Sequence, residues 1–370
     1  MTGRLVRVVV LLLIACWMLA ACSGRADGHE SSPGVKHQEY VFADGRAYIY
    51  DIDHHMRAAG TFRLPGVTEI KGVAASVKNG DLYVSYLVSR SDGWVAAYTL
   101  QTGRLVWRRS YSIGVDSMCL TPNGKRMYLP EGDYTQGTHW RVIDTANGDV
   151  VATIETGLGT HDTACGRHRV YMGPHSDPYL YVASTKTNRV TKRIGPLAGG
   201  VTPFVINHAE TLAFTTSQGL LGFQVSSLKT GKVLYTVAPK GFSWNQTSEG
   251  VPSHGIALSP NGKRVWVIDM PNNYVHVFDV SGLPASPPRE VANIKLKHGL
   301  AGLENEYESR EGWLSFSRGG RYVFVGDTGE VIDTHTLHMV TYRSPLAHTR
   351  QYIEIDWSHG RPIYASPRLN

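Results

Sequence analysis

The chain has 370 residues, of which 42% are hydrophobic, 18% are charged and 39 are glycine. This composition is typical of a globular protein with many turns. The formal net charge of +6 is modest, and basic pairs such as Lys125-Arg126 and Lys263-Arg264 are scattered along the chain. We therefore expect no nucleic-acid partner.

The N-terminus has the pattern of an export signal. Arg4 and Arg7 precede an apolar run from Val8 to Leu19, and the run closes with Leu19-Ala20-Ala21-Cys22. A positive start, about a dozen apolar residues and small residues at the cleavage point are typical of a secretory signal, and the run is short for a transmembrane span. Leu-Ala-Ala-Cys resembles the lipobox of bacterial lipoproteins, which implies cleavage before Cys22 and acylation of its thiol. The alternative is an ordinary cleaved signal with a chance cysteine.

This signal divides the chain into three segments. We expect a signal peptide over residues 1–21, a lipidated Cys22 with a flexible polar tether over residues 22–39, and a folded domain over residues 40–370. Two or three acyl chains are enough for stable anchoring. The expected location is therefore the bacterial cell envelope, outside the cytoplasm, with the membrane as a partner through the lipid anchor.

Internal repeats indicate the fold. Residues 120–129 read LTPNGKRMYL and residues 258–267 read LSPNGKRVWV, so one motif is written twice. Degenerate copies begin near Val77, Cys165, Asn207, Phe316 and Trp357, which makes seven units. Each unit is an apolar strand, a turn rich in Pro, Asn or Gly, and a second strand rich in aromatic residues. This is the pattern of a β-hairpin.

A second hairpin follows each of the first six units, as at Arg141–Asp144 and Val150–Ala152. Two hairpins make a four-stranded blade, and units of about 40 to 55 residues fit one blade each. The seventh unit, near Tyr364, has no outer hairpin, whereas Ala47–Ile52 and Thr61–Leu64 form an outer hairpin without an inner one. The sequence therefore predicts an all-β, seven-bladed β-propeller of four-stranded blades, closed by N-terminal outer strands that complete the C-terminal blade. A β-sandwich or an open β-solenoid is the alternative.

Two stretches carry a resemblance to a family. Ser259–Val267, continued by Val275–Val280, resembles the repeat of YVTN-type β-propellers, and so does Val142–Gly148. The likeness covers about Tyr40 to Asn370 and implies the propeller architecture. This family and the related lactonase-like propellers include enzymes, binding proteins and members without a known role. The usual Tyr-Val-Ala-Asn is replaced by Trp266-Val267-Ile268-Asp269, so no ligand can be carried over by motif.

Propeller geometry predicts a site in the central funnel. The connections that enter the innermost strands open on one face, so residues just upstream of these strands converge there. Counting back about twelve residues from the aromatic after each turn gives a ring of candidates. The ring consists of Lys71, Asp116, His161 with Asp162, Thr202, His254, Glu311 with Trp313, and Arg350 with Tyr352.

Such a ring offers several kinds of chemistry. Two imidazoles, carboxylates, a lysine and an arginine could hold a divalent metal ion, bind an anionic ligand, or act as acid and base. The metal candidates are His161, His254 and Asp116, and no catalytic residue is assigned. The plain alternative is that these polar residues only line a water-filled channel.

The functional expectation follows from the signal and the funnel. We expect a cell-envelope lipoprotein that acts as a ligand-binding or protein-binding propeller scaffold, with an envelope protein or a small molecule as partner. The alternative is a metal-assisted, lactonase-like hydrolase or lyase with its site in the funnel. The sequence has no Gly-x-Ser-x-Gly elbow, Walker loop or His-Glu-x-x-His motif, so serine hydrolase, nucleotide and zinc-protease functions lose their support.

Two further features belong to the propeller. Cys119 and Cys165 lie in inner strands of adjacent predicted blades, where we expect buried thiols, with a disulfide as the open alternative outside the cytoplasm. Two long loops, Pro239–Ser253 and Gly282–Gly312, are expected on the funnel face. Phe242 and Trp244 in the first loop could contact a ligand or partner, or could pack the loop onto the ring.

Overall fold

The computed structural model describes residues 34–367, apart from residues 112, 246–250 and 300–310. The signal peptide, Cys22 and most of the expected tether therefore lie outside the described residues. Strands dominate, and the helices are two short 3-10 turns, Asp133–Thr135 and Ser344–His348, among the residues described. Within this same part of the chain, no helix is both long and apolar enough to span a bilayer.

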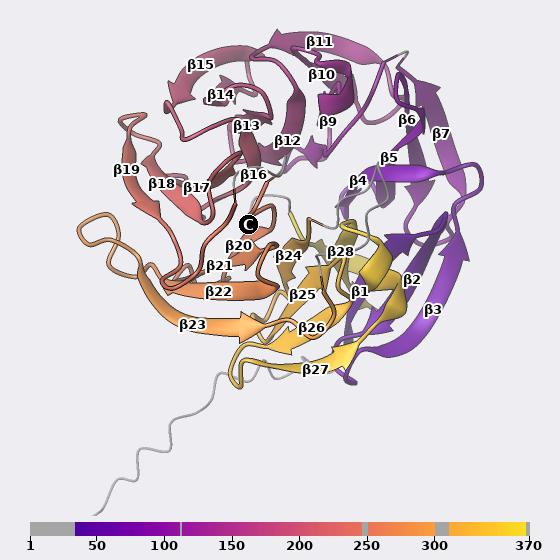
Figure 1. Ribbon diagram of the computed structural model, residues 1–370. Helices are drawn as coiled ribbons and strands as arrows, with labels where there is room; N and C mark the ends of the chain where they lie inside the picture. The colour runs from indigo at the N-terminus through magenta and orange to yellow at the C-terminus, as the bar shows by residue number, and fades with distance from the viewer. Residues whose placement is uncertain (1–33, 112, 246–250, 300–310, 368–370) are drawn as a thin grey trace, which may run out of the picture. The chain divides into compact units, whose positions relative to one another are not determined.

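Seven antiparallel sheets follow one another around a central axis, each as one blade of a β-propeller (Figure 1). The predicted fold class is confirmed. Blade one contains β4 (Glu69–Ser76), β5 (Asp81–Ser89), β6 (Asp92–Thr99) and β7 (Leu105–Ser110). Blade two contains β8 (Cys119–Leu120), β9 (Arg126–Pro130), β10 (His139–Asp144) and β11 (Val150–Glu155). Blade three contains β12 (Thr160–Cys165), β13 (Arg169–Pro174), β14 (Leu180–Ser184) and β15 (Arg189–Ile194).

The next three blades repeat this order, with the first strand innermost. Blade four contains β16 (Val201–Ile206), β17 (Leu212–Ser217), β18 (Phe223–Ser227) and β19 (Val233–Val237). Blade five contains β20 (Ile256–Leu258), β21 (Arg264–Asp269), β22 (Tyr274–Asp279) and β23 (Arg289–Lys295). Blade six contains β24 (Trp313–Phe316), β25 (Tyr322–Gly326), β26 (Glu330–Asp333) and β27 (His338–Tyr342).

The repeated Pro-Asn-Gly turn joins the first two strands of a blade. In blade two, the Asn123 side chain accepts hydrogen bonds from the Lys125 amide at 3.0 Å and from the Thr121 hydroxyl at 2.7 Å. Gly124 follows with a φ of +73°, a backbone conformation that glycine adopts without steric cost. In blade five, Asn261 accepts the corresponding bonds from Lys263 at 3.0 Å and from Ser259 at 2.8 Å. The motif is therefore repeated because the same turn is built twice.

The seventh blade closes the ring with strands from both ends of the described chain. Strand β28 (Tyr352–Ser358) pairs with β1 (Val35–Ala43), and β2 (Arg46–Asp51) and β3 (Arg57–Arg63) complete the blade. The predicted closure is confirmed, but the N-terminal part supplies three strands where the sequence indicated a hairpin. The remaining strand, β29 (Arg361–Ala365), pairs with the other edge of β28 as a fifth strand.

Strand β1 begins ahead of the expected domain boundary at Tyr40. Its residues His37 and Glu39 are polar, as expected for a tether. Both are nevertheless buried, and the strand forms a ladder with β28. Sequence patterning recognises a strand by alternating apolar residues, and this pattern is missing here. The folded domain therefore includes residues that were expected to belong to the tether.

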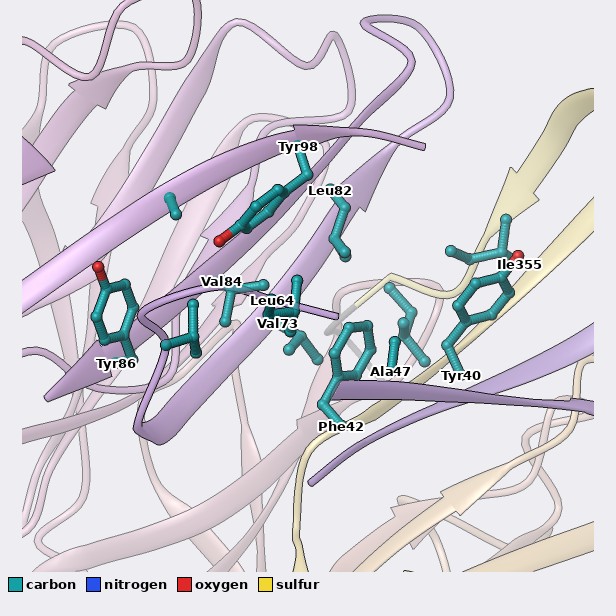
Figure 2. Packing of buried hydrophobic residues seen from close by; sticks show 13 residues of the cluster. Tyr40, Phe42, Ala47, Leu64, Val73, Leu82, Val84, Tyr86, Tyr98 and Ile355 are labelled. Atoms are coloured by element: carbon teal, nitrogen blue, oxygen red, sulfur yellow. The ribbon is translucent and has the colours of Figure 1, made fainter. Parts of the chain in front are cut away.

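The hydrophobic core is divided among the seams between neighbouring blades. Figure 2 shows the seam where the first and last blades meet, with Tyr40 and Phe42 of β1 and Ile355 of β28 facing Val73 and Leu82 of blade one. Phe42 and Ile355 are fully buried. Burying aromatic and branched aliphatic side chains contributes roughly 1.5–3 kcal/mol each, so this seam stabilises the closed ring.

A disulfide joins two adjacent blades near the axis. Cys119 of β8 and Cys165 of β12 are bonded, with 5.6 Å between their Cα atoms and a sequence separation of 46 residues. The expectation of two buried thiols was therefore wrong. The sequence places both cysteines in inner strands, but only the packing of blade two against blade three brings them within bonding distance.

Candidate functional site

A carboxylate and an imidazole meet at the entrance to the central funnel. Asp116 precedes β8, and its Oδ2 lies 2.8 Å from Nδ1 of His161 in β12. Both side chains are largely buried. Although burial opposes ionisation, His161 and Lys71 hold the pKa of Asp116 below its usual range. An ionised carboxylate only accepts hydrogen bonds, so Nδ1 of His161 carries the proton of this contact.

His254 is the second imidazole of the funnel. Burial lowers the pKa of His254 to about 3, and Arg350 and His161 add to this effect against the opposing influence of Glu311. Its Nδ1 donates to the carbonyl of Gly312 at 3.0 Å. The ring is therefore neutral at physiological pH, and its unprotonated Nε2 lies 3.3 Å from Oε2 of Glu311.

Glu311 and Arg350 form the charged side of the funnel. Nη1 of Arg350 lies 2.6 Å from Oε2 of Glu311, and its Nε lies 3.5 Å from Oδ2 of Asp327. Burial alone would lower the pKa of Arg350, but Asp327 and Glu311 raise it above its ordinary value. Since arginine stays charged and both carboxylates lie within ion-pair distance, the guanidinium holds this side of the funnel in place.

Four rings form a row in the funnel, from His175 through His161 and His254 to Trp313. The centroid of the His161 ring lies 5.6 Å from that of His175 and 6.0 Å from that of His254, and the His254 ring lies 5.8 Å from Trp313. Rings at such distances pack edge to face or tilted. His175 and Trp313 are partly exposed, so the row faces solvent at both ends.

Lys71 lies at the rim of the funnel. Its Nζ contacts Oε1 of Glu69 at 2.5 Å and the hydroxyl of Tyr134 at 3.4 Å. Burial would lower the pKa of Lys71, but Asp116, Tyr134 and Glu69 outweigh burial and raise it. Lys71 therefore remains charged and adds a cation on the Asp116 side of the site.

Two of the predicted site residues, Asp162 and Thr202, bond to other parts of the propeller instead. The carboxylate of Asp162 accepts hydrogen bonds from the amides of Thr163 at 3.0 Å and Phe204 at 3.2 Å, which ties blade three to blade four. Thr202 is fully buried, with its hydroxyl 2.6 Å from that of Thr216. The count along the sequence found the right strand ends, but it could not say which of two neighbouring side chains faces the axis.

The funnel does not bring its three metal candidates together as a ligand set. In the described part of the chain, one set of three such side chains has its ligand atoms within 4.8 Å of one another. This set is His37, Glu354 and Asp356. It contains none of His161, His254 and Asp116. The donor geometry of the funnel therefore gives no support to the divalent metal ion that was considered there.

Three residues of the site were missed by the sequence reasoning. Tyr134, His175 and Asp327 follow the second strand of their blades, β9, β13 and β25 respectively. The count used only the connections that enter innermost strands, yet the turns after the second strands return to the same face. A polar or aromatic residue within four residues after the second strand of a repeat is the signal that could have found them.

A cavity of about 210 Å³ lies along the inner strands. Its lining includes Trp313 and Arg350 of the funnel site, Cys119 and Cys165, and residues 365–367, which begin at the last residue of β29. Trp313 and Arg350 therefore border both the funnel site and the cavity.

The first long loop packs back onto its blade. The ring of Phe242 lies 4.8 Å from Tyr274 and 4.6 Å from His276, and the Asn272 side chain donates to the carbonyl of Ser243 at 3.1 Å. Of the two roles considered for Phe242, the structure supports packing of the loop. The second expected loop, Gly282–Gly312, was wrong in part, because its residues Arg289–Lys295 form strand β23 and pair with β22. Residues 246–250 and 300–310 lie outside the described residues.

No protein-family model matches the chain, and no curated protein matches it. Solved structures do match. The chain is similar to hydrazine synthase of Kuenenia stuttgartiensis, with a TM-score of 0.59, 14% identity and coverage of 81% of this chain and 90% of that chain. It is also similar to the dihydro-heme d1 dehydrogenase NirN in complex with DHE, with a TM-score of 0.57, 14% identity and coverage of 92% and 77%.

A third similar structure is the β-propeller domain of Cps50 (Swd1) from Myceliophteria thermophila, with a TM-score of 0.50, 13% identity and coverage of 81% of this chain and 86% of that chain. At these identities the likeness shows the fold alone.

Proposed function

We propose that this chain is a cell-envelope lipoprotein of the YVTN-repeat type whose propeller binds a small molecule in its funnel. The signal ending at Cys22 supports export and anchoring to the bacterial envelope. The bond between Cys119 and Cys165 supports the same location, because disulfides persist mainly outside the cytoplasm. The rigid ring of blades supplies a scaffold on which the funnel side chains keep their positions.

The row of rings from His175 through His161 and His254 to Trp313 carries the binding proposal. Aromatic faces favour a planar ligand, and imidazole nitrogens add hydrogen-bonding groups beside those faces. Asp116 fixes one imidazole, Lys71 places a cation near Asp116, and Arg350 places a second cation beside Glu311. This arrangement fits a planar molecule with polar substituents.

Acid–base catalysis is the second candidate function, and one observation favours it. A carboxylate that orients an imidazole through Nδ1 prepares the other ring nitrogen to act as a general base. The lactonase-like hydrolase or lyase alternative therefore keeps a base at His161, although its metal has no support in the funnel geometry. The fold relatives do not decide between the two candidates, since enzymes with this fold are as remote in sequence as the other neighbours.

The binding proposal is tested with the full chain expressed in a bacterial host and extracted from membranes in detergent. The immobilised protein is incubated with a deproteinised extract of bacterial cells, and retained compounds are identified by mass spectrometry. His161→Ala and Trp313→Ala should lose a compound that the wild type retains. The control is His335→Ala, because that side chain is 67% exposed and lies in a turn between outer strands.

The same preparations separate the outcomes. If wild type and His161→Ala retain the same compounds, the binding proposal is wrong. If a lactone is hydrolysed by wild type but not by His161→Ala, the enzyme candidate replaces it. If an envelope protein is retained by both and no compound is, the propeller is a protein scaffold instead.

A further inference from the structure

A second cluster of ionisable side chains lies where the N-terminal strand β1 meets β28. Nδ1 of His37 lies 3.0 Å from Oδ1 of Asp356 and 3.7 Å from Oε1 of Glu354. All three side chains are buried. The ligand atoms of this trio lie within 4.8 Å of one another, which is close enough for one cation to contact all of them after a small contraction.

Glu39, on the same strand as His37, is a fourth candidate ligand. Glu39 pairs directly with Glu354 in the register of β1 and β28, so the two carboxylates lie on the same face of the sheet. Glu39 is 1% exposed, and its Oε1 is buried without a hydrogen-bond partner. A buried carboxylate oxygen without a donor is costly, and in native proteins it calls for a specific explanation. A bound cation would supply one.

The surrounding charges leave room for a divalent ion. Nη1 of Arg318 donates to Oδ2 of Asp356 at 2.6 Å, and the backbone amide of Arg318 donates to Oε2 of Glu354 at 2.6 Å. These contacts leave Oδ1 of Asp356 and the second oxygen of Glu354 facing His37. When a bound cation displaces the proton of His37, the imidazole is neutral and the three ionised carboxylates carry a formal charge of −3. Arg318 and a divalent cation together neutralise this charge.

We propose that His37, Glu39, Glu354 and Asp356 form a binding site for one divalent cation that joins the first strand of the propeller to β28. Zn²⁺ accepts both imidazole nitrogen and carboxylate oxygen as ligands, so it is the probe chosen for this set of one imidazole and three carboxylates. Asp356 lies near the far end of β28 from Arg350, so this site is separate from the funnel. Its effect would be to stabilise the closed ring, because metal binding to the folded state adds to folding free energy.

Zinc titration of the full chain tests the proposal. The detergent-extracted protein is freed of metal with EDTA, exchanged into metal-free buffer and titrated with ZnCl₂ in a calorimeter. We expect one zinc ion per wild-type chain. Glu39→Gln and Glu354→Gln should weaken binding by about tenfold or more, since each removes a ligand without changing side-chain size. The matched control is His161→Ala in the funnel, which should bind zinc like the wild type.

A thermal measurement guards against misfolded variants. Without metal, Glu39→Gln should melt at the same temperature as wild type or slightly higher, because it replaces a buried acid by a neutral amide. Zinc should then raise the melting temperature of wild type and His161→Ala but not of Glu39→Gln. A wild type that binds no zinc at micromolar concentrations overturns the proposal. So does zinc binding that is lost in His161→Ala and kept in Glu39→Gln.

Discussion

Oδ2 of Asp116 lies 2.8 Å from Nδ1 of His161, so a carboxylate at the entry to blade two orients an imidazole that belongs to blade three. Such a pair fixes the tautomer of the ring as well as its direction. The orientation of His161 in the funnel is therefore set by a neighbouring blade.

Asp116→Asn tests this relationship. The amide has nearly the same shape but can offer either an oxygen or an NH₂ group, so Nδ1 of His161 no longer has to carry the proton. We expect the population of the Nδ1-protonated tautomer to fall, as measured by ¹⁵N NMR of the histidine side chains. Retention of the funnel compound should fall by about tenfold, which corresponds to about 1.4 kcal/mol. The control is Asp162→Asn, because Asp162 bonds to the amides of Thr163 and Phe204. An unchanged His161 spectrum in Asp116→Asn would contradict the assigned role.

The proposed lipid anchoring depends on a single thiol, that of Cys22. Cys22→Ala should abolish incorporation of labelled palmitate and shift the protein out of the membrane fraction, because the acylated cysteine is the proposed anchor. Cys16 lies within the proposed signal peptide, so the Cys16→Ala protein should still incorporate palmitate and stay in the membrane fraction. Equal labelling of the two variants would show that Cys22 is not the modified residue.

The disulfide between blades two and three should contribute to stability. It closes a loop of 46 residues, and bonds of this kind typically stabilise by about 2–4 kcal/mol. Cys119→Ser, Cys165→Ser and the double variant should therefore have equal losses in free energy of unfolding, measured in urea. Reductant should bring the wild type to the same value and leave the variants unchanged. Two free thiols in the denatured, unreduced wild type would refute the bond.

The ionisable groups where β1 meets β28 should make the folded state less stable as the pH becomes alkaline. Glu354, with Asp356 and Asp53, raises the pKa of His37 to about 9, above its unfolded value near 6.5. Because folded His37 binds its proton more tightly than unfolded His37, protonation stabilises the folded state. This stabilisation is fully present below pH 6.5 and is lost as the pH rises through 9. Burial raises the pKa of Glu354 to about 7, so its proton likewise favours the folded state and is lost in the same direction as the pH rises.

Melting temperatures measured in EDTA between pH 6 and 10 check this dependence. The wild type should lose stability over the range, and His37→Gln should lose less because it lacks the titrating imidazole. His335→Gln should follow the wild type, since that side chain is exposed. Parallel curves for wild type and His37→Gln would show that His37 does not contribute.

The repeats made the architecture predictable, because each copy of the turn around Asn123 and Asn261 carries its own local hydrogen bonds. The same reasoning found Asp116, His161, His254, Glu311 and Arg350, since strand ends converge on one face of a propeller. It could not find strand β1, where His37 and Glu39 replace the apolar residues that normally identify a strand. It also could not pair Cys119 with Cys165, because sequence spacing says nothing about how adjacent blades pack.

The closure of the ring has a consequence for the order of folding. Strand β1 forms its ladder with β28, and Val41 pairs with Tyr352, so the partner is synthesised about three hundred residues later. Contacts so distant in sequence form late, because a long loop must close before they contribute. Until then, β1 exposes an unpaired edge to other chains. A nascent or truncated chain that lacks β28 should therefore need a chaperone to keep this edge covered.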